Sequence, residues 1–292
     1  MAGRPSPPIL PEVLGLFGPT ASGKTAVAEA IAARIPAELV SADSMQFYRG
    51  LPVLTNQDAR ARLVGVWPLD RQATVGEFQR LAHEAIDEIV AAGRTAVVVG
   101  GSGLWFQAAL TDVALPADVP PGARARWERL YDRRGAATAH GLLARRDPRA
   151  AARVHRNDRK RVVRALELWH AGSTLVPERP RLWTAELRRP TLVVGLDVPP
   201  AVLAERIRAR AEAMFERGVE EEVRNAGEVA PQVLGLEAVR TLPRAEAVGE
   251  LERATLRFAT YQRKWMRRIP GIVVVDAERP AEEVADAILD RC

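Results

Sequence analysis

The feature that most constrains this chain is a glycine-rich segment near its amino terminus, GPTASGKT at residues 18–25. The segment fits the pattern G-x-x-x-x-G-K-[ST], follows the apolar run Val13–Phe17 and opens a helical pattern that extends to Arg34. Glycines allow such a loop to turn its backbone N–H groups inward, and the start of a helix adds partial positive charge. A phosphate-binding loop is therefore predicted, formed by Gly18, Pro19, Thr20, Ala21, Ser22, Gly23, Lys24 and Thr25.

Two side chains of this loop have separate predicted roles. Lys24 is one of only three lysines in a chain that otherwise uses arginine, and a compact ammonium fits inside a narrow loop that a guanidinium would crowd. We expect Lys24 to reach the terminal phosphate as a catalytic charge, and the Thr25 hydroxyl to bind Mg²⁺. The alternative, a glycine-rich turn formed by chance, is disfavoured by the strand and helix patterns on either side.

Short apolar runs rich in Val, Ile and Leu predict the sheet to which this loop belongs. They lack the alternation of half-exposed strands, which is typical of parallel strands covered on both faces. Helical patterns alternate with these runs, so the predicted fold class is α/β with a doubly wound parallel sheet. The predicted strands are residues 13–17, 39–42, 96–100, 192–196 and 272–275, and the predicted helices are residues 23–34, 75–92, 200–217 and 250–266.

The segment from residue 112 to residue 189 has no strand-like run and is rich in arginine and alanine. Residues 124–164 hold 14 basic and 4 acidic side chains, whereas the whole chain has a net charge of +5. We therefore predict a helical, basic insertion domain at residues 112–189 within a core made of residues 1–111 and 190–292. Concentrated positive charge favours a polyanionic partner, and a solvated arginine-rich helix is the alternative.

Several classes of protein are excluded or disfavoured by what the sequence lacks. No run approaches the roughly 20 apolar residues of a membrane helix, and the proline-rich first residues do not resemble a signal peptide. A single cysteine, Cys292, excludes a disulfide framework and a cysteine zinc site. We expect a cytoplasmic protein with no membrane partner. Its oligomeric state is not indicated, and a monomer is the default expectation.

The second predicted strand ends in the sequence Ser41-Ala42-Asp43-Ser44. Ligands of doubly wound sheets bind beyond the carboxyl ends of the strands, so we expect Asp43 to lie beside the phosphate loop. A carboxylate there can hold Mg²⁺ or accept a proton from a nucleophile. The alternative is an aspartate that only caps the following turn.

Five segments, in this order, resemble the bacterial tRNA dimethylallyltransferases. Together they span residues 12–268, and the set is far more specific than the phosphate loop alone. The resemblance implies a P-loop NTPase-like core with a helical insertion that contacts tRNA. The segments are GPTASGKT, SADSMQFYRGLPVLT, VVVGGSGLWFQAAL, DPRAAARVHRNDRKRVVRALELW and GLDVPPAVLAERIRARAEAMFERGVEEEV.

The resemblance also implies a reaction. A dimethylallyl group passes from dimethylallyl diphosphate to N6 of adenosine 37, beside the tRNA anticodon, with Mg²⁺ and without ATP. It implies that Asp43 is the general base and that Ser102, where the family usually has threonine, bonds the diphosphate or the amine. Arg206 or Arg210 is expected to stabilise the leaving diphosphate, and the sequence leaves the choice open. The implied tRNA contacts are Asp43, Ser44, Met45, Gln46, Ser102, Lys160, Arg161, Val162, Val163, Arg164 and Gln262.

Residue patterns support one part of this interpretation. If Asp158 caps a helix, then Lys160, Arg161 and Arg164 share one face of it, which suits phosphates of an anticodon arm. The opposite face of the same helix would carry Val162, Leu166 and Trp169. Aromatic residues that could stack on an extruded adenosine, or that could belong to the core, are Phe47, Tyr48 and Trp105.

The chain departs from the family pattern in the last long helix, where Thr260 and Tyr261 replace a lysine and an arginine. Further departures are Leu236 and Gln57. Two other functions stay open from the sequence. One is a P-loop kinase of a small metabolite that binds ATP and uses insertion arginines as a lid. The other is a non-catalytic, nucleotide-gated RNA-binding module.

Overall fold

The computed structural model describes residues 10–112, 119, 122–176, 186–229 and 232–292. The chain divides into two compact units, which we treat separately. The core unit consists of Met1–Asp112 and Trp183–Cys292, and the helical unit consists of Val113–Leu182. The insertion predicted from the sequence, residues 112–189, begins one residue before this helical unit and ends seven residues after it. No helix of the described residues combines the length and hydropathy that a membrane-spanning segment requires.

The core unit is built on a parallel sheet of five strands in the order β2-β3-β1-β4-β5. Each of the five predicted apolar runs forms one of these strands. The central strand β1 pairs with β3 on one side and with β4 on the other, and its last residue, Phe17, lies in register with Gly100 and Gly195. The strands are β1 (Val13–Phe17), β2 (Ala37–Ser41), β3 (Thr95–Gly100), β4 (Thr191–Asp197) and β5 (Val273–Asp276).

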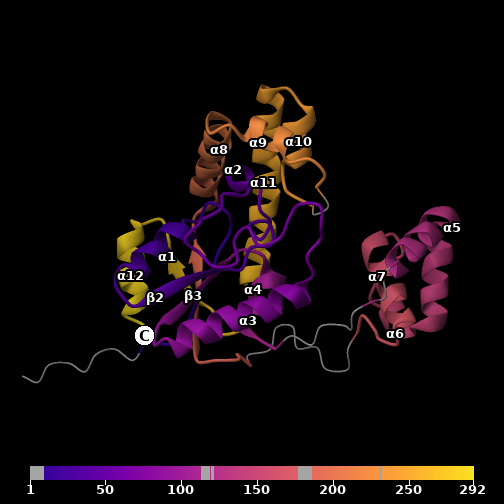
Figure 1. Cartoon of the computed structure of the whole chain (residues 1–292), viewed down its shortest axis with the longest axis horizontal. Helices are drawn as coiled ribbons and strands as arrows, with labels where there is room; N and C mark the ends of the chain where they lie inside the picture. Colours follow the sequence, from indigo (N-terminus) through magenta and orange to yellow (C-terminus); the bar gives the residue numbers. More distant parts are fainter. Residues whose placement is uncertain (1–9, 113–118, 120–121, 177–185, 230–231) are drawn as a thin grey trace, which may run out of the picture. The chain divides into compact units, whose positions relative to one another are not determined.

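Helices cover both faces of the sheet, which makes the α/β fold class a confirmed prediction. Along β1, Leu14 and Leu16 belong to the core cluster on one face. On the other face, a Cβ at Gly15 would lie 2.9 Å from the ring of Phe106. The covering helices (Figure 1) are α1 (Lys24–Ala32) and α12 (Ala281–Leu289) on the first face, and α3 (Val75–Ala91) and α4 (Gly103–Leu110) on the second.

The remaining helices of the core unit contain one boundary that the sequence predicted wrongly. The predicted helix 250–266 begins earlier, at Arg244, because Pro243 stands at its start and the buried stripe continues through Ala247 and Leu251. A proline suits this place, since its missing N–H would have no partner in the first turn. These helices are α2 (Pro52–Thr55), α8 (Pro200–Glu216), α9 (Val219–Asn225), α10 (Leu236–Thr241) and α11 (Arg244–Met266).

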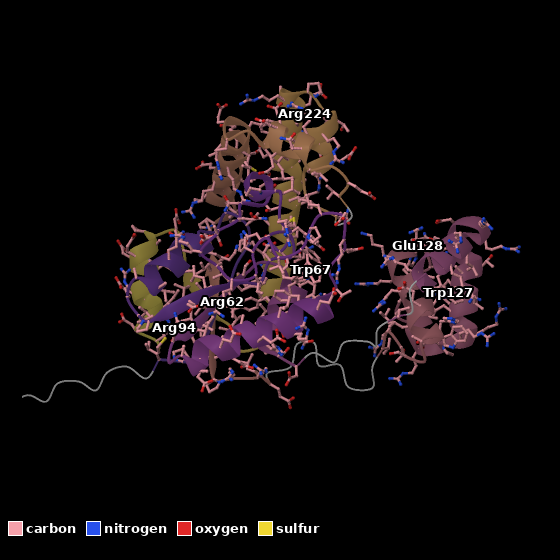
Figure 2. The ribbon with its side chains drawn as sticks, in the orientation of Figure 1. Arg62, Trp67, Arg94, Trp127, Glu128 and Arg224 are labelled. Atoms are coloured by element: carbon pink, nitrogen blue, oxygen red, sulfur yellow. The ribbon has the colours of Figure 1, made fainter. Side chains whose placement is uncertain are left out.

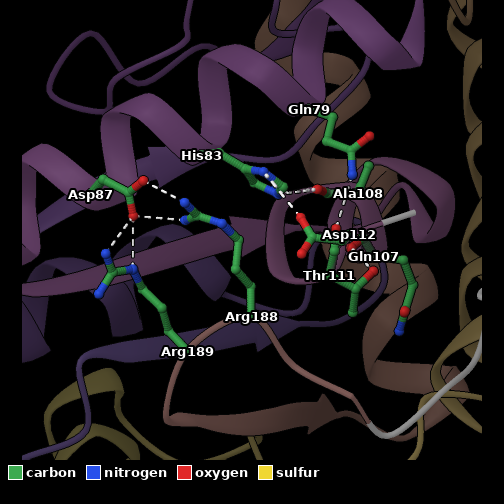
Figure 3. A network of polar contacts seen from close by, with 9 residues as sticks. All are labelled: Gln79, His83, Asp87, Gln107, Ala108, Thr111, Asp112, Arg188 and Arg189. Atoms are coloured by element: carbon green, nitrogen blue, oxygen red, sulfur yellow. Dashed lines mark hydrogen bonds and ion pairs between the residues drawn. The ribbon is translucent and has the colours of Figure 1, made fainter. Parts of the chain in front are cut away.

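A charged cluster fastens the segment that enters β4 to helix α3 (Figure 3). The carboxylate of Asp87 on α3 accepts hydrogen bonds from Arg188 (2.6 Å) and Arg189 (2.7 Å), and Arg189 also bonds Glu12 at 2.7 Å. The hydrogen bond from Arg188 is the main reason that the pKa of Asp87 falls to about 2. The backbone N–H of Arg188 also donates to the carbonyl of Leu110, at the end of α4. The cluster therefore holds both chain ends that adjoin the helical unit.

The described residues of the helical unit form helices only, as predicted. A buried cluster that includes Trp127 (labelled in Figure 2), Leu143 and Leu166 holds them together. Gly135, with φ of +77°, interrupts the longest helix. The Asp158 carboxylate accepts from the N–H of Arg161 at 3.1 Å, so the predicted helix cap is confirmed. The helices are α5 (Ala123–Arg146), α6 (Pro148–Ala151) and α7 (Arg159–His170).

Candidate active site

A cavity of about 390 Å³ opens in the core unit where β1 and β2 end. The phosphate loop forms one side of it, the turn after β2 forms another, and α8 and α11 close it. This is the edge of the sheet at which a doubly wound fold binds its ligands. The ionisable and polar side chains that line it include Lys24, Thr25, Asp43, Arg206, Arg210 and Gln262.

The backbone of the phosphate loop has the conformation that its glycines predict. Gly23 has φ of +87° and is the residue before α1, a conformation that glycine adopts without a Cβ clash. Ala21 also has a positive φ, +63°, which is uncommon for a residue with a Cβ and is typical of functional loops. A Cβ at Gly18 would lie 2.7 Å from the Ser22 hydroxyl. The loop can therefore close tightly only with glycine at position 18.

Lys24 is the first residue of α1, and its side chain folds back under the loop. Its ammonium donates to the carbonyl oxygens of Gly18 (2.9 Å) and Pro19 (2.7 Å). The pKa of Lys24 is lowered to about 8, mainly because the side chain is buried. The charge of Asp43 opposes this effect, and the charge of Arg210 adds to it. The ammonium is therefore placed where a phosphate group could take the place of two carbonyl oxygens.

Of the two candidate arginines on α8, Arg210 is the one attached to the phosphate loop. Its Nη1 donates to the Thr20 hydroxyl at 2.9 Å. Burial is the main cause that lowers the pKa of its guanidinium, and the charge of Asp43 opposes that effect. Arg206 lines the same cavity one turn earlier on the helix. Both arginines face the cavity, and the loop contact favours Arg210 as the residue that meets the leaving group.

Asp43 follows β2 and lines the cavity together with Lys24. One carboxylate oxygen accepts a hydrogen bond from the Met45 N–H at 2.9 Å, which fixes the side chain in a tight turn. The carboxylate caps its turn, and it also lies beside the phosphate loop as expected, so capping is not the whole of its position. Asp43, Lys24 and Arg210 line the same cavity, and the charge of Asp43 acts to raise the pKa values of Lys24 and Arg210.

An apolar wall completes the cavity, and the sequence analysis did not identify it. It comes from α2, α8 and α11, so only the folded chain brings it together. The one signal in the sequence is the spacing 251, 255, 258 and 262, which places these residues on a single face of a helix. The wall includes Leu54, Ile207, Met214, Leu251 and Phe258.

Comparison with known proteins places this site in a family. The family model described as IPP transferase matches residues 46–269. The tRNA dimethylallyltransferase of Acidothermus cellulolyticus is 38% identical, with 95% of this chain and 93% of the relative covered. The enzyme of the same name from Mycobacterium tuberculosis is also 38% identical, with 90% and 92% covered. The chain belongs to the IPP transferase family.

Solved structures agree with this assignment. The tRNA isopentenylpyrophosphate transferase of Bacillus halodurans is 27% identical, with a TM-score of 0.66 over 96% of this chain and 97% of the other. A eukaryotic dimethylallyltransferase acting on tRNA has a TM-score of 0.73 at 21% identity, over 91% of this chain and 73% of the other, and thus shares the fold. The predicted P-loop NTPase-like core is confirmed. The family match does not favour the small-metabolite kinase that the phosphate loop alone left open.

The IPP transferase family match begins at residue 46, so the phosphate loop is an observation independent of it. Within the matched region, Ser102 does not line the cavity. Its hydroxyl lies 3.1 Å from the Ser44 hydroxyl and 3.4 Å from the Ser44 N–H. Ser102 therefore braces the turn that holds Asp43, and its direct contact with substrate stays a prediction.

Gln46 and Met45 lie in the turn that follows Asp43. The Gln46 amide donates to the carbonyl oxygens of Asn56 (2.7 Å) and Thr55 (3.3 Å), and its oxygen accepts from the Ser41 hydroxyl at 2.9 Å. These bonds hold the end of α2 against the end of β2. Met45 and Gln46 both line the cavity. Contact of either residue with tRNA stays a prediction.

Gln262 on α11 has a role in this structure that sequence reasoning missed. It is only 2% exposed, and its side-chain oxygen accepts from the backbone N–H of Thr20 at 2.7 Å. A Cβ at Gly101 would overlap the Gln262 amide. The second glycine of the GGSG segment is thus required for α11 to reach the phosphate loop. The predicted contact of Gln262 with tRNA stays untested.

The predicted RNA contacts of the helical unit divide by exposure. Lys160 and Arg161 are exposed and Arg164 is partly exposed, as the predicted helix face requires. Val162 and Val163 are buried, so their side chains pack inside the helical unit rather than forming part of that face.

The aromatic candidates for stacking belong to the core. Phe47, Tyr48 and Trp105 are all buried. The rings of Phe47 and Trp105 lie 5.3 Å apart, and that of Phe78 lies 4.4 Å from Trp105. The core alternative is therefore the correct one for these three residues.

Proposed function

We propose that this chain transfers the dimethylallyl group of dimethylallyl diphosphate to N6 of adenosine 37 in tRNA and releases diphosphate. The observation that carries the proposal is the composition of a single cavity. It combines a phosphate loop, a carboxylate and an apolar wall. Each part suits one piece of the reaction, namely the diphosphate, the attacking amine and the five-carbon group.

The leaving diphosphate is where negative charge grows during the reaction. The bond between the allylic carbon and the diphosphate oxygen breaks, and its electron pair leaves with the diphosphate. Lys24, Arg210 and the N–H groups at the start of α1 stabilise that charge. Cations and donors already positioned in a water-poor site are especially effective for this purpose, because they need no rearrangement as the charge develops.

The attacking atom is N6 of the adenosine, which forms the new carbon–nitrogen bond and must lose a proton. Asp43 is suited to accept it, because its carboxylate faces the cavity and its position is fixed by the Met45 N–H. A base within reach of the reacting nitrogen contributes about 10²- to 10⁴-fold to such reactions. The adenosine must leave the stack of the anticodon loop to reach Asp43.

The apolar wall has a use that a kinase site lacks. The dimethylallyl group carries five carbons, and Leu251, Met214 and Phe258 offer it apolar contact beside the phosphate loop. Burial of such a group stabilises binding by roughly 25 cal/mol per Å² of apolar surface. This wall supports the allylic diphosphate over a nucleoside triphosphate as the bound donor.

Mg²⁺ is proposed as the cofactor. It prefers hard oxygen ligands and is commonly held by one or two protein groups together with phosphate oxygens. The Thr25 hydroxyl fits this requirement, since Thr25 follows Lys24 and lines the same cavity. When bound, Mg²⁺ would neutralise part of the charge of the diphosphate.

The tRNA anticodon arm is the proposed second substrate, and the exposed basic face of α7 is the proposed contact for its phosphates. Lys160, Arg161 and Arg164 carry this face. We expect the chain to act as a monomer, because each proposed catalytic residue belongs to the core unit of one chain. We also expect it to act in the cytoplasm.

The decisive experiment supplies the full chain with Mg²⁺, unmodified tRNA and labelled dimethylallyl diphosphate, then digests the tRNA and analyses its nucleosides by mass spectrometry. Dimethylallyladenosine is expected, mapped to the position beside the anticodon. A parallel reaction contains ATP labelled at its terminal phosphate. Absence of prenylated adenosine, or transfer of label from ATP, would overturn the proposal.

A matched variant tests the assigned base. Asp43→Asn keeps the size of the side chain and an oxygen for the Met45 N–H, but it cannot accept the proton. We expect kcat to fall by about a hundredfold or more, while the affinity for pyrophosphate does not decrease. Unchanged turnover would remove Asp43 from the mechanism.

A further inference from the structure

Tyr261 on α11 is an unusual surface residue in this structure. Tyr261 is 53% exposed, and in the described part of the chain only Val274, at 54%, is a comparably exposed large hydrophobic residue. The aromatic residues close to the turn after β2 are buried in the core. Tyr261 is therefore an aromatic ring available to a partner beside the candidate active site.

A neighbouring aromatic residue, Trp265, holds the Tyr261 ring in place. The Tyr261 ring contacts Trp265 at 5.8 Å between centroids, with the ring planes at 71°. Trp265 lies directly against Gly103, where any Cβ would overlap its ring. Gly103 follows Ser102, whose hydroxyl braces the Asp43 turn. A continuous set of contacts thus runs from the candidate base to the exposed ring of Tyr261.

The position of Tyr261 along α11 places it next to the cavity but outside it. Gln262, the next residue, lines the cavity and holds the phosphate loop. Successive residues of a helix point about 100° apart, so the Tyr261 ring projects beside the cavity rather than into it. It can meet a part of the substrate that stays outside while the reacting group is inside.

Positive charge accompanies the ring. Lys264 lies three residues beyond Tyr261 on the same side of α11, Arg268 lies in the turn just after this helix, and both are exposed. Neither forms an ion pair with an acidic side chain of the described residues, whereas Arg263, on another side of α11, pairs with Asp197 at 2.9 Å. An exposed ring beside unneutralised cations is the combination that binds single-stranded nucleic acid.

We infer that Tyr261 is a stacking platform for the unpaired base next to the target adenosine, and that Lys264 and Arg268 hold the adjoining phosphates. When the adenosine leaves the anticodon stack, its neighbour loses a stacking partner. The Tyr261 ring replaces that partner and so offsets part of the cost of extrusion. Tyr261 is a positioning residue for RNA, and this role rests on the proposed function.

The test compares the full-length wild type with Tyr261→Ala and Tyr261→Phe, using an anticodon stem-loop RNA and dimethylallyl diphosphate. Loss of the ring is expected to raise KM for the RNA about tenfold, equivalent to about 1.4 kcal/mol. Tyr261→Phe keeps the ring and should behave as the wild type. KM for dimethylallyl diphosphate should not change in either variant, because Tyr261 does not line the cavity.

A spectroscopic measurement separates stacking from a purely structural role. An RNA with 2-aminopurine beside the target adenosine should lose fluorescence on binding to the wild type and to Tyr261→Phe, and markedly less on binding to Tyr261→Ala. Val274→Ala removes a side chain of similar exposure, 54%, from strand β5 and is the matched control. It should bind and quench as the wild type does.

Three results would overturn the inference. These are an unchanged KM for RNA in Tyr261→Ala, equal quenching by all variants, or equal losses in Tyr261→Phe and Tyr261→Ala. A change in self-association instead of RNA binding would assign this face to a protein interface. Because the wild type must first prenylate the RNA, its inactivity would count against the proposed function and not against Tyr261 specifically.

Discussion

The buried positive charge of the core-unit cavity differs from the exposed positive charge of the helical unit. In the core unit, burial lowers the pKa values of Lys24 and Arg210, and both side chains rest against carbonyl or hydroxyl oxygens. In the helical unit, hydrogen bonds to Asp132 raise the pKa of Arg159 above its ordinary value. The cavity of the core unit thus encloses two cations, whereas the cations of the helical unit are mostly exposed and several of them, including Arg159, Arg161 and Arg164, have acidic neighbours.

The difference indicates what each unit can recognise. An enclosed cation without a carboxylate partner gains most from a bound anion, so the core cavity suits a diphosphate in one fixed position. Exposed arginines such as Arg161 and Arg164, which lie near Asp158 and Glu167, interact weakly and are screened by salt. They suit a large polyanion whose many phosphates can exchange among contacts. The predictions below test this contrast.

The largest effect is expected for Lys24→Ala. Lys24 is proposed to stabilise the negative charge that develops on the leaving diphosphate, so its removal is expected to lower kcat by roughly a thousandfold. The affinity for tRNA should not change. Turnover is followed with labelled dimethylallyl diphosphate, and tRNA binding by filter retention. Arg80→Ala, on the exposed side of α3, removes an equal charge and should alter neither quantity. A large loss of tRNA binding in Lys24→Ala would contradict the separation of roles.

Salt dependence distinguishes the helical unit. The double variant Arg161→Ala, Arg164→Ala should reduce the slope of log K against log salt by about two units, roughly one for each phosphate contact. Between 50 and 200 mM salt, the affinity of this double variant for tRNA should therefore fall about sixteenfold less than that of the wild type. The double variant Arg80→Ala, Arg94→Ala removes the same charge from the core unit. If both double variants change the slope equally, net charge and not this helix face governs binding.

The pH dependence of diphosphate binding tests the enclosed lysine. Because the pKa of Lys24 is lowered to about 8, its ammonium is present at pH 7 and is lost as the pH rises through 8. Wild type should therefore bind pyrophosphate more tightly than Lys24→Met at pH 7. That advantage should shrink above pH 8, by up to about tenfold per pH unit. A constant advantage up to pH 10, measured by titration calorimetry, would show that Lys24 keeps its proton.

The smallest predicted effect concerns the helix that carries the exposed arginines. Asp158→Ala removes the cap of α7 and should destabilise its first turn by about 1 kcal/mol. Amide hydrogen exchange there should become about fivefold faster. Asp158→Asn removes the charge but keeps an oxygen acceptor, so its exchange should stay close to that of the wild type. Equal acceleration in both variants would assign the effect to charge instead of capping.

Much of the fold was predictable because local patterns determine it. Residues 13–25 predict a strand, a loop and a helix, and this arrangement is observed with strand β1 at Val13–Phe17. Parallel strands buried on both faces were predictable from runs such as 192–196, which show no alternation. The order β2-β3-β1-β4-β5 was not predictable, since it depends on how distant segments pair.

The site was predictable only in its polar half. Asp43 comes just after β2, and Lys24 and Thr25 end the loop that follows β1, so the strand ends bring them together at one edge. The apolar wall joins α2, α8 and α11, and no local pattern distinguishes a residue that lines a cavity from one that packs in the core. The same limit explains why Phe47 and Trp105 were candidates for stacking and are core residues, while Tyr261 drew attention only as a departure from the family pattern.

The hydrogen bond between Thr20 and Gln262 joins residues 242 positions apart. During synthesis, the loop leaves the ribosome long before its partner on α11 does. The amino-terminal half can form strand and helix early, but the nascent chain cannot assemble the finished site until nearly all of it has been translated. A chain truncated before residue 262 is therefore expected to lack a properly closed donor pocket, even though every residue of the loop itself is present.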